Sequence, residues 1–159
     1  MLRPFPLPLG VGTDLCRVAR VHAILAGPRR GRFLRRVLAP EERAAVGDGH
    51  GGDGGRAHDG HAHDEARQQA VTETALWRTA VFVAGRFAAK EAAIKAHWPH
   101  RRLSWHDIVI ERRGGGGAPV ARIRAAAGAG LGGDASALVS ISHDGEYATA
   151  VCVAYLGEG

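Results

Sequence analysis

The stretch that decides the fold is Val81–His97, which reads VFVAGRFAAKEAAIKAH. It ends the longest helical pattern in the chain, Thr72–His97. At ~100° per residue, Val83, Phe87 and Ile94 fall on one face of such a helix. The periodicity therefore predicts a long helix whose apolar face is buried against other parts of the chain.

Shorter patterns lie on both sides of this helix. Before it we expect a strand at Leu9–Asp14, a helix at Leu15–Leu25 and a second helical region at Phe33–Val46 that restarts at Pro40. After it we expect strands at Asp107–Glu111, Val120–Arg124, Leu138–Ser142 and Tyr147–Ala154. The last two strands flank Asp144-Gly145, which is typical of a β-hairpin turn. The length of 159 residues fits a single domain, 1–159.

The segment Gly47–Arg67 differs from the rest in composition. It reads GDGHGGDGGRAHDGHAHDEAR and is almost free of large apolar side chains. Such a segment cannot bury enough apolar surface to offset the entropy lost on ordering, so we expect a disordered insertion at 47–67. Its histidines could bind Zn²⁺ or Ni²⁺ adventitiously, and a polar loop is the simpler interpretation; they are His50, His58, His61 and His63.

Positive charge is concentrated at one end of the chain. The formal net charge is +5, and residues 1–36 hold eight arginines but only one acidic residue, Asp14. A basic end favours an acidic partner. Composition alone leaves the choice open between nucleic acid, anionic lipid and an acidic protein.

Several features bear on the compartment. No apolar run approaches the ~20 residues that span a bilayer, and Met1–Leu9 is too short for a secretory signal. Cys16 and Cys152 are the only cysteines and lack the spacing of a metal or redox motif. This favours free thiols in a reducing compartment, either cytoplasmic or mitochondrial.

Two carboxylates border the expected apolar elements. Asp14 ends the first strand, and Glu91 lies at the edge of the apolar helix face. Each has an ordinary explanation: Asp14 caps the next helix, and Glu91 pairs with Lys95 one turn further on. The alternative is a shared site for Mg²⁺, which takes one or two carboxylates and completes its shell with phosphate oxygens and water. Spacing alone favours the ordinary explanations.

Five blocks of sequence, in the right order, resemble those of holo-acyl-carrier-protein synthases, which are 4′-phosphopantetheinyl transferases. The blocks are Gly12-Thr13-Asp14 with Arg20-Val21, FLRRVLAPEE at Phe33–Glu42, AGRFAAKEAAIKA at Ala84–Ala96, DIVI at Asp107–Ile110, and SISHD at Ser140–Asp144. They extend over nearly the whole chain, and the third is the most specific. The insertion and the wording SWHDIVI at 104–110 look like eukaryotic, mitochondrial-type members.

The resemblance implies a fold and a site. The fold is α+β, with a long helix packed against an antiparallel sheet, and it assembles as a homotrimer with active sites at subunit interfaces. Asp14 and Glu91 match the magnesium ligands, with the metal bridging them to the pyrophosphate of coenzyme A. The implied coenzyme contacts are Arg86, Lys90, Lys95 and, near the nucleotide end, His143.

The implied reaction moves the 4′-phosphopantetheine arm of coenzyme A to a serine of an apo acyl carrier protein and releases 3′,5′-ADP. Phosphoryl transfer depends on charge neutralisation and alignment, which implies roles for Asp14, Glu91 and Lys95. The general base stays open between Glu42, in the second block, and a water on the metal. Because carriers of this class are acidic, the basic first helix predicts carrier docking at Arg17 and Arg20.

Two other classes of protein compete with this interpretation. A basic nucleic-acid-binding module is suggested by the isoelectric point of about 10.0, but residues 1–36 offer only Phe5 and Phe33 for base stacking. A metal-buffering protein built on the histidine tract leaves the remaining sequence unexplained. Neither accounts for the five blocks.

Overall fold

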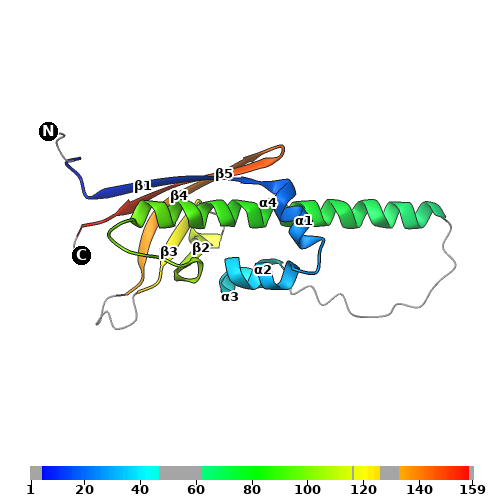
Figure 1. Ribbon diagram of the computed structural model, residues 1–159, viewed down its shortest axis with the longest axis horizontal. Coiled ribbons are helices and arrows are strands. Elements are labelled where there is room, and N and C mark those ends of the chain that lie inside the picture. The colour runs from blue at the N-terminus through cyan, green and yellow to red at the C-terminus, as the bar shows by residue number, and fades with distance from the viewer. Residues whose placement is uncertain (1–4, 47–61, 116, 126–132, 158–159) are drawn as a thin grey trace.

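A five-stranded sheet and a long helix across one face of it form the body of the protein (Figure 1). The computed structural model describes residues 5–46, 62–115, 117–125 and 133–157. The helices are α1 (Val18–Leu25), α2 (Arg30–Val37), α3 (Pro40–Arg43) and α4 (Ala62–His97), with 3-10 turns η1 (Ala44–Val46), η2 (Trp105–Asp107) and η3 (Arg113–Gly115). The strands are β1 (Leu9–Arg17), β2 (Ile108–Arg112), β3 (Pro119–Ile123), β4 (Ala135–Asp144) and β5 (Tyr147–Tyr155).

The strands follow the order β1-β5-β4-β3-β2, and every neighbouring pair is antiparallel. β1 pairs with β5 along its whole length, from Leu9 opposite Tyr155 to Arg17 opposite Tyr147. β4 and β5 form the expected hairpin, in which Gly145 has a φ of 50° that favours glycine. The expected α+β fold, a long helix packed on an antiparallel sheet, is confirmed.

Small residues allow α4 to lie very close to the sheet. Buried alanines occur along the length of α4, and Ala92 and Ala96 are the ones that meet β1; the buried set includes Ala80, Ala84, Ala88, Ala89, Ala92, Ala93 and Ala96. A Cβ atom on Gly12 of β1 would overlap the carbonyl oxygen of Ala92. One on Gly10 would likewise overlap the carbonyl oxygen of Ala96. Glycine at both positions therefore lets β1 rest directly on the backbone of α4.

This packing differs from the face predicted by periodicity. Val83 is fully buried, but Phe87 and Ile94 are only partly buried at its margin. Hydrophobic periodicity follows large side chains, whereas a close helix–sheet contact selects small ones. The face toward the sheet is therefore set by alanine.

The boundaries of β1 and α1 also differ from the sequence prediction. β1 continues past Asp14 to Arg17, so α1 begins at Val18 and not at Leu15. The reason is the partner strand: Leu15 pairs with Thr149, and the ladder continues to Arg17. Long-range pairing with β5 overrides the local helical pattern.

The long helix begins earlier than predicted. α4 starts at Ala62 and not at Thr72, so residues 62–67 of the expected insertion are helical. Residues 47–61 of that insertion, with three of its four histidines, lie outside the described residues. None of the described helices is both long and apolar enough to cross a bilayer.

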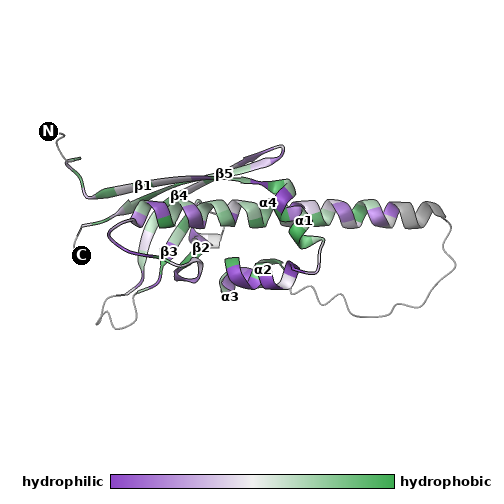
Figure 2. Ribbon diagram, in the orientation of Figure 1, coloured by the Kyte–Doolittle hydropathy of each residue, from purple (hydrophilic) through white to green (hydrophobic). Residues whose placement is uncertain are grey.

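The sheet face opposite α4 carries apolar side chains that nothing in this chain covers, as far as it is described. Exposed apolar residues of this face are Leu9, Val11, Leu15, Leu138, Tyr147, Val151 and Tyr155. Their strands lie side by side, because Val153 pairs with both Val11 and Leu138. In Figure 2 the strands are largely coloured as hydrophobic, and the hairpin tip and α2–α3 are more hydrophilic.

Candidate active site

Asp14 is carried to the side of α4 by the close contact between β1 and the helix. Alternate residues of β1 face the helix, and Gly12 lies over Ala92 and beside the Cβ atom of Lys95. Asp14, two residues further along, accepts a 2.8 Å hydrogen bond from Lys95 Nζ. Lys95 Nζ also donates to the carbonyl oxygen of Thr13 at 2.8 Å. The Asp14 carboxylate is 18% exposed and the Lys95 side chain 51%, so both remain accessible to a ligand.

Glu91 lies one turn before Lys95 on the same side of α4, because residues four apart on a helix are neighbours. Its only partner among the described residues is Trp105, whose indole Nε1 donates to Oε1 at 2.5 Å. Lys95 bonds to Asp14 and not to Glu91. Glu91 therefore lies one turn from the residue that bonds to Asp14, and both residues are on the same side of α4.

Both ordinary explanations for these carboxylates are wrong. The N-cap of α1 is Arg17, without a capping side chain, so Asp14 is a strand residue and not a cap. The expected ion pair between Glu91 and Lys95 is replaced by the ion pair between Asp14 and Lys95. Each carboxylate needs another explanation for its position.

The donor set fits a hard divalent cation. Oδ2 of Asp14 and Oε2 of Glu91 have no partner in the part of the chain that the structure describes. No cluster of three or more histidine, cysteine or acidic side chains suited to a metal occurs among those residues. Mg²⁺ matches this arrangement, because it binds one or two carboxylates and takes its other ligands from phosphates and water.

Glu42 and Lys90 form a buried ion pair, a geometry that does not favour the roles predicted for them. Lys90 is fully buried, and its Nζ donates to Glu42 Oε2 at 2.5 Å and to the carbonyl oxygens of Val37 and Trp105, each at 2.9 Å. All three N–H groups of Lys90 are therefore used within the core, and none is available to a coenzyme phosphate. Burial lowers the pKa of Lys90, and Glu42 opposes this shift.

Glu42 is equally occupied. Its Oε2 also accepts the backbone N–H of Ala39 at 2.8 Å, and Oε1 accepts that of Ile110 at 3.1 Å. The carboxylate is 4% exposed. This geometry does not support Glu42 as the general base; the residue instead ties α3 to α4 and β2.

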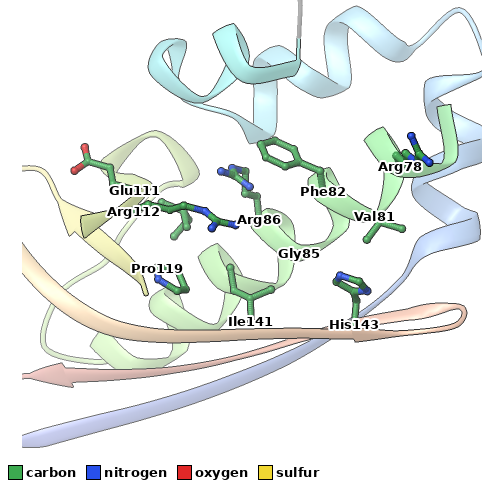
Figure 3. Close-up of a pocket in the computed structure, with 11 residues that line it drawn as sticks. Arg78, Val81, Phe82, Gly85, Arg86, Glu111, Arg112, Pro119, Ile141 and His143 are labelled. Carbon is green, nitrogen blue, oxygen red and sulfur yellow. The ribbon is translucent and has the colours of Figure 1, made fainter. Parts of the chain in front are cut away.

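A second basic site lies on the other side of α4. A cavity of about 350 Å³ opens between α4, β2 and β4 (Figure 3). Its basic side chains are Arg78, Arg86, Arg112 and His143, and the acidic Glu111 at its rim is paired with Arg122 at 2.5 Å. Figure 3 shows Arg86 and Arg112 pointing toward each other, with His143 rising from β4. This excess of positive charge suits a polyanionic ligand.

Arg86 is held in that cavity by its neighbours. Its guanidinium lies 3.5 Å from the ring centroid of Phe82, and its Nε is 3.9 Å from Glu42 Oε1. Burial lowers the pKa of Arg86, Glu42 opposes the shift and Arg112 adds to it. Of the four implied coenzyme contacts, Arg86 and His143 line this cavity and Lys90 and Lys95 do not; Arg78 and Arg112, which also line it, were not singled out from the sequence.

The two sites face opposite sides of the same helix. Lys95 and Arg86 are nine residues apart, which at ~100° per residue is half a turn plus whole turns. Asp14 comes from β1 at one edge of the sheet, whereas His143 comes from β4 further across it. The structure therefore brings Asp14 and Lys95 together and brings Arg86 and His143 together, but in separate groups.

The basic residues near the first helix surround an apolar groove. Arg17 is exposed and lies 3.4 Å from Glu146, and the Arg20 guanidinium lies 5.3 Å from the ring centroid of Phe87. Between α1 and α2 a cavity of about 270 Å³ is lined by Ile24, Phe33, Arg29, Arg32 and Arg36. The last three were not singled out from the sequence, although their spacing of three and four residues is a helical signal.

Comparison with known proteins agrees with the five sequence blocks. Residues 10–152 match the family model of the 4′-phosphopantetheinyl transferase superfamily. Over 147 residues the chain is 38% identical to a holo-[acyl-carrier-protein] synthase of Anaeromyxobacter dehalogenans, covering 91% of this chain and 94% of that protein. It is 32% identical over 157 residues to the mitochondrial 4′-phosphopantetheinyl transferase B of Aspergillus fumigatus, covering 96% and 97%.

A solved structure shows the same arrangement of helix and sheet. The Plasmodium yoelii acyl carrier protein synthase with ADP bound superposes with a TM-score of 0.58 at 26% identity, over 91% of this chain and 92% of that one. The sequence match, the fold and the order of the blocks agree with one another. The chain therefore belongs to the 4′-phosphopantetheinyl transferase superfamily and is of the holo-acyl-carrier-protein synthase type.

Proposed function

We propose that this protein transfers the 4′-phosphopantetheine arm of coenzyme A to a serine of an apo acyl carrier protein, requires Mg²⁺, and releases 3′,5′-ADP. The observation that carries the proposal is that Lys95 of α4 bonds to Asp14 of β1, while Glu91 lies one helical turn before Lys95. Relatives that share the family are holo-acyl-carrier-protein synthases, and one of them has been solved with ADP bound.

Asp14 and Glu91 would hold the magnesium ion through Oδ2 and Oε2. When bound, the ion supplies charge neutralisation for the diphosphate of coenzyme A. Lys95 bonds to Asp14, lies one turn after Glu91 and is half exposed, so its ammonium can turn from Asp14 to a phosphate oxygen of the ligand. Its pairing with Asp14 thus holds the Lys95 ammonium near the proposed binding position of the diphosphate.

In the transfer, the serine hydroxyl oxygen of the carrier attacks the β-phosphorus of coenzyme A. The new bond joins serine to the phosphate of phosphopantetheine, and the bond from that phosphorus to the bridging oxygen breaks. The electron pair leaves with 3′,5′-ADP, and the serine proton passes to a base. Both oxygens of Glu42 are engaged in the core, which supports a base other than Glu42.

The second basic cavity is proposed to bind the nucleotide end of coenzyme A. Arg86 and His143 are supported by their place in this cavity, and Arg78 and Arg112 add positive charge for the 3′-phosphate. Since this cavity and the Asp14–Lys95 group face opposite sides of α4, one coenzyme that contacts both must bridge two copies of the chain. The separation of the basic cavity from the Asp14–Lys95 group therefore favours an active site between subunits.

The proposed assembly is a homotrimer that buries the uncovered face of the sheet. A continuous apolar patch of this kind is unusual on a monomer and typical of a subunit interface. Sedimentation equilibrium provides the direct test. We expect the wild-type protein to have the mass of three chains. We expect the variant in which Val11 and Leu15 are both changed to Asp to have the mass of one chain.

Carrier docking is proposed at the arginines around α1 and α2. Arg20 lies on α1 one turn before Ile24, which lines the groove together with Phe33, and Arg17 directly precedes α1. An apolar floor with a rim of guanidinium groups suits an acidic protein that also presents apolar side chains. This combination fits a protein partner better than nucleic acid.

The reaction is tested by mass spectrometry of the carrier. Incubating the protein with coenzyme A, Mg²⁺ and an apo acyl carrier protein should add the mass of one phosphopantetheine to the carrier. Chelation of the metal should stop the reaction, and a carrier whose acceptor serine is changed to alanine should gain nothing. If several different apo carriers, each with its acceptor serine intact, all remain unmodified, the proposed activity is excluded.

A further inference from the structure

Trp105 is fixed from both its backbone and its ring. Its carbonyl oxygen accepts a 2.9 Å hydrogen bond from the buried ammonium of Lys90. Its ring packs against Phe87 with centroids 5.5 Å apart, and the guanidinium of Arg36 lies 5.2 Å from its centroid. Held in this way, the indole N–H has a defined direction.

That N–H points at the carboxylate of Glu91. The distance from Nε1 to Oε1 is 2.5 Å, and the two residues are 14 apart in sequence, so the contact joins η2 to α4. An indole nitrogen donates but never accepts, which fixes Oε1 as its acceptor. The carboxylate is thus held in one rotation about its terminal bond, with Oε2 directed elsewhere.

The donor is neutral, and this distinguishes Glu91 from Asp14. Asp14 is paired with a cation, which offsets its charge until Lys95 moves. Glu91 has no ion pair among the described residues, so the indole orients it without reducing its negative charge. A carboxylate that is oriented yet fully charged suits a cation ligand.

We infer that Trp105 is a positioning residue for Glu91, acting through its indole N–H to aim Oε2 at the metal. The inference rests on the proposed metal site. Phenylalanine at this position would keep the ring contacts to Phe87 and Arg36 but would lose the donor. Donors to metal ligands typically change metal affinity by about 10–100-fold when removed.

The first experiment measures Mn²⁺ binding to the full-length protein with coenzyme A present, by the loss of the free-ion signal in electron paramagnetic resonance. We expect Trp105→Phe to weaken Mn²⁺ binding about tenfold while the melting temperature stays within a few degrees. The matched control is Trp98→Phe, because the Trp98 ring is 55% exposed and contacts Arg102. Wild-type affinity in Trp105→Phe would overturn the inference.

A second variant separates the N–H from the shape of the ring. Replacing Trp105 by 3-benzothienylalanine puts sulfur in place of the N–H and keeps the bicyclic ring. Mn²⁺ binding as weak as in Trp105→Phe supports the inference, and wild-type binding overturns it. This comparison holds even if phenylalanine lowers the stability of the protein.

Two further measurements identify which proposal has failed, should one fail. Glu91→Gln should abolish tight Mn²⁺ binding; if it does not, the proposed metal site itself is wrong. If Glu91→Gln loses the metal and Trp105→Phe does not, the metal site stands and the positioning role is wrong. With saturating Mn²⁺, carrier modification should recover in Trp105→Phe but not in Glu91→Gln, because a positioning residue is compensated by metal concentration.

Discussion

Glu91 and Asp14 look alike in sequence, but their surroundings make them different. Glu91 accepts a hydrogen bond from a neutral indole, whereas Asp14 is paired with an ammonium group. In the proposed metal site, the negative charge of Glu91 is therefore not offset by a paired cation. The Asp14 carboxylate would become available once the Lys95 ammonium bonds to a phosphate oxygen.

The shared metal site predicts a specific kinetic result. Glu91→Gln and Asp14→Asn keep side-chain shape but remove charge, so each variant should fold, with kcat reduced about 10²–10³-fold as for other preorganised electrostatic groups. The double variant should lose little more, because residues that act as a unit are not additive. Steady-state kinetics across a Mg²⁺ titration measures this. Near-wild-type kcat and Mg²⁺ dependence in both single variants would contradict a shared metal.

The buried pair of Glu42 and Lys90 predicts a loss of stability. Lys90→Met leaves the Glu42 carboxylate in the core without its cation, which should cost about 3–5 kcal/mol of unfolding free energy. Glu42→Gln made in the same chain should restore part of it. Urea denaturation supplies the values. Unchanged stability with a raised KM for coenzyme A would instead return Lys90 to the coenzyme site.

At the level of elements, the approach of β1 to α4 depends on glycine. Gly12→Ala would drive a Cβ atom into the carbonyl oxygen of Ala92, so β1 must move outward and carry Asp14 with it. We expect a loss of about 1–3 kcal/mol and a fall in Mg²⁺ affinity. Gly133→Ala is the control, since a Cβ there meets nothing within 4 Å. Equal behaviour of the two variants in denaturation would show that β1 is not so constrained.

Sequence patterns predicted the presence of helices and strands better than the residues at which they begin and end. The strand at Leu9, the restart at Pro40 and the hairpin at Gly145 were recognised because turn and helix-start chemistry is local. The end of β1 at Arg17 was missed because pairing with β5 decides it. The alanine face of α4 was missed because close packing favours side chains that periodicity scarcely registers.

The candidate site also contains residues that the sequence identified correctly as neighbours and residues whose surroundings it could not predict. The sequence motifs selected Asp14, Glu91 and Lys95, and the structure brings them to one side of α4. Motifs also selected Lys90 and Glu42, whose burial depends on α3 and β2 and is invisible in a linear pattern. A motif records which residues recur together and does not separate those that contact a ligand from those that hold the core.

For the whole molecule, two sites on opposite sides of α4 predict complementation between chains. In the proposed intersubunit site, Glu91→Gln removes a residue of one half, and the double variant Arg112→Ala/His143→Ala removes residues of the other. Co-refolding the two inactive proteins should restore about a quarter of wild-type activity, the random share of interfaces that pair two intact halves. Activity no greater than that of the separate variants would show that each chain contains a complete site.

The basic groove predicts how the enzyme recognises its carrier. Arg29→Glu with Arg32→Glu should raise KM for the carrier on the order of tenfold, because charge complementarity governs encounter. KM for coenzyme A should stay unchanged. Salt should weaken the wild-type reaction, since exposed charges are screened beyond ~8 Å at physiological ionic strength. Arg102→Glu, a charge reversal beside Trp98, is the control, and equal effects of the two substitutions would argue against the groove.

The pairing of the first strand with the last has a consequence for how the protein is made. Asp14 lies opposite Ala150, and the Thr149 hydroxyl donates to its carbonyl oxygen at 3.0 Å. This ladder joins residues more than a hundred positions apart, and such non-local contacts slow folding. While the chain emerges from the ribosome, α4 can form early, but β1 must wait for β5 to be synthesised. The strand pairing that positions Asp14 therefore forms only after β5 has been synthesised, and a nascent chain without β5 has no partner strand for Asp14.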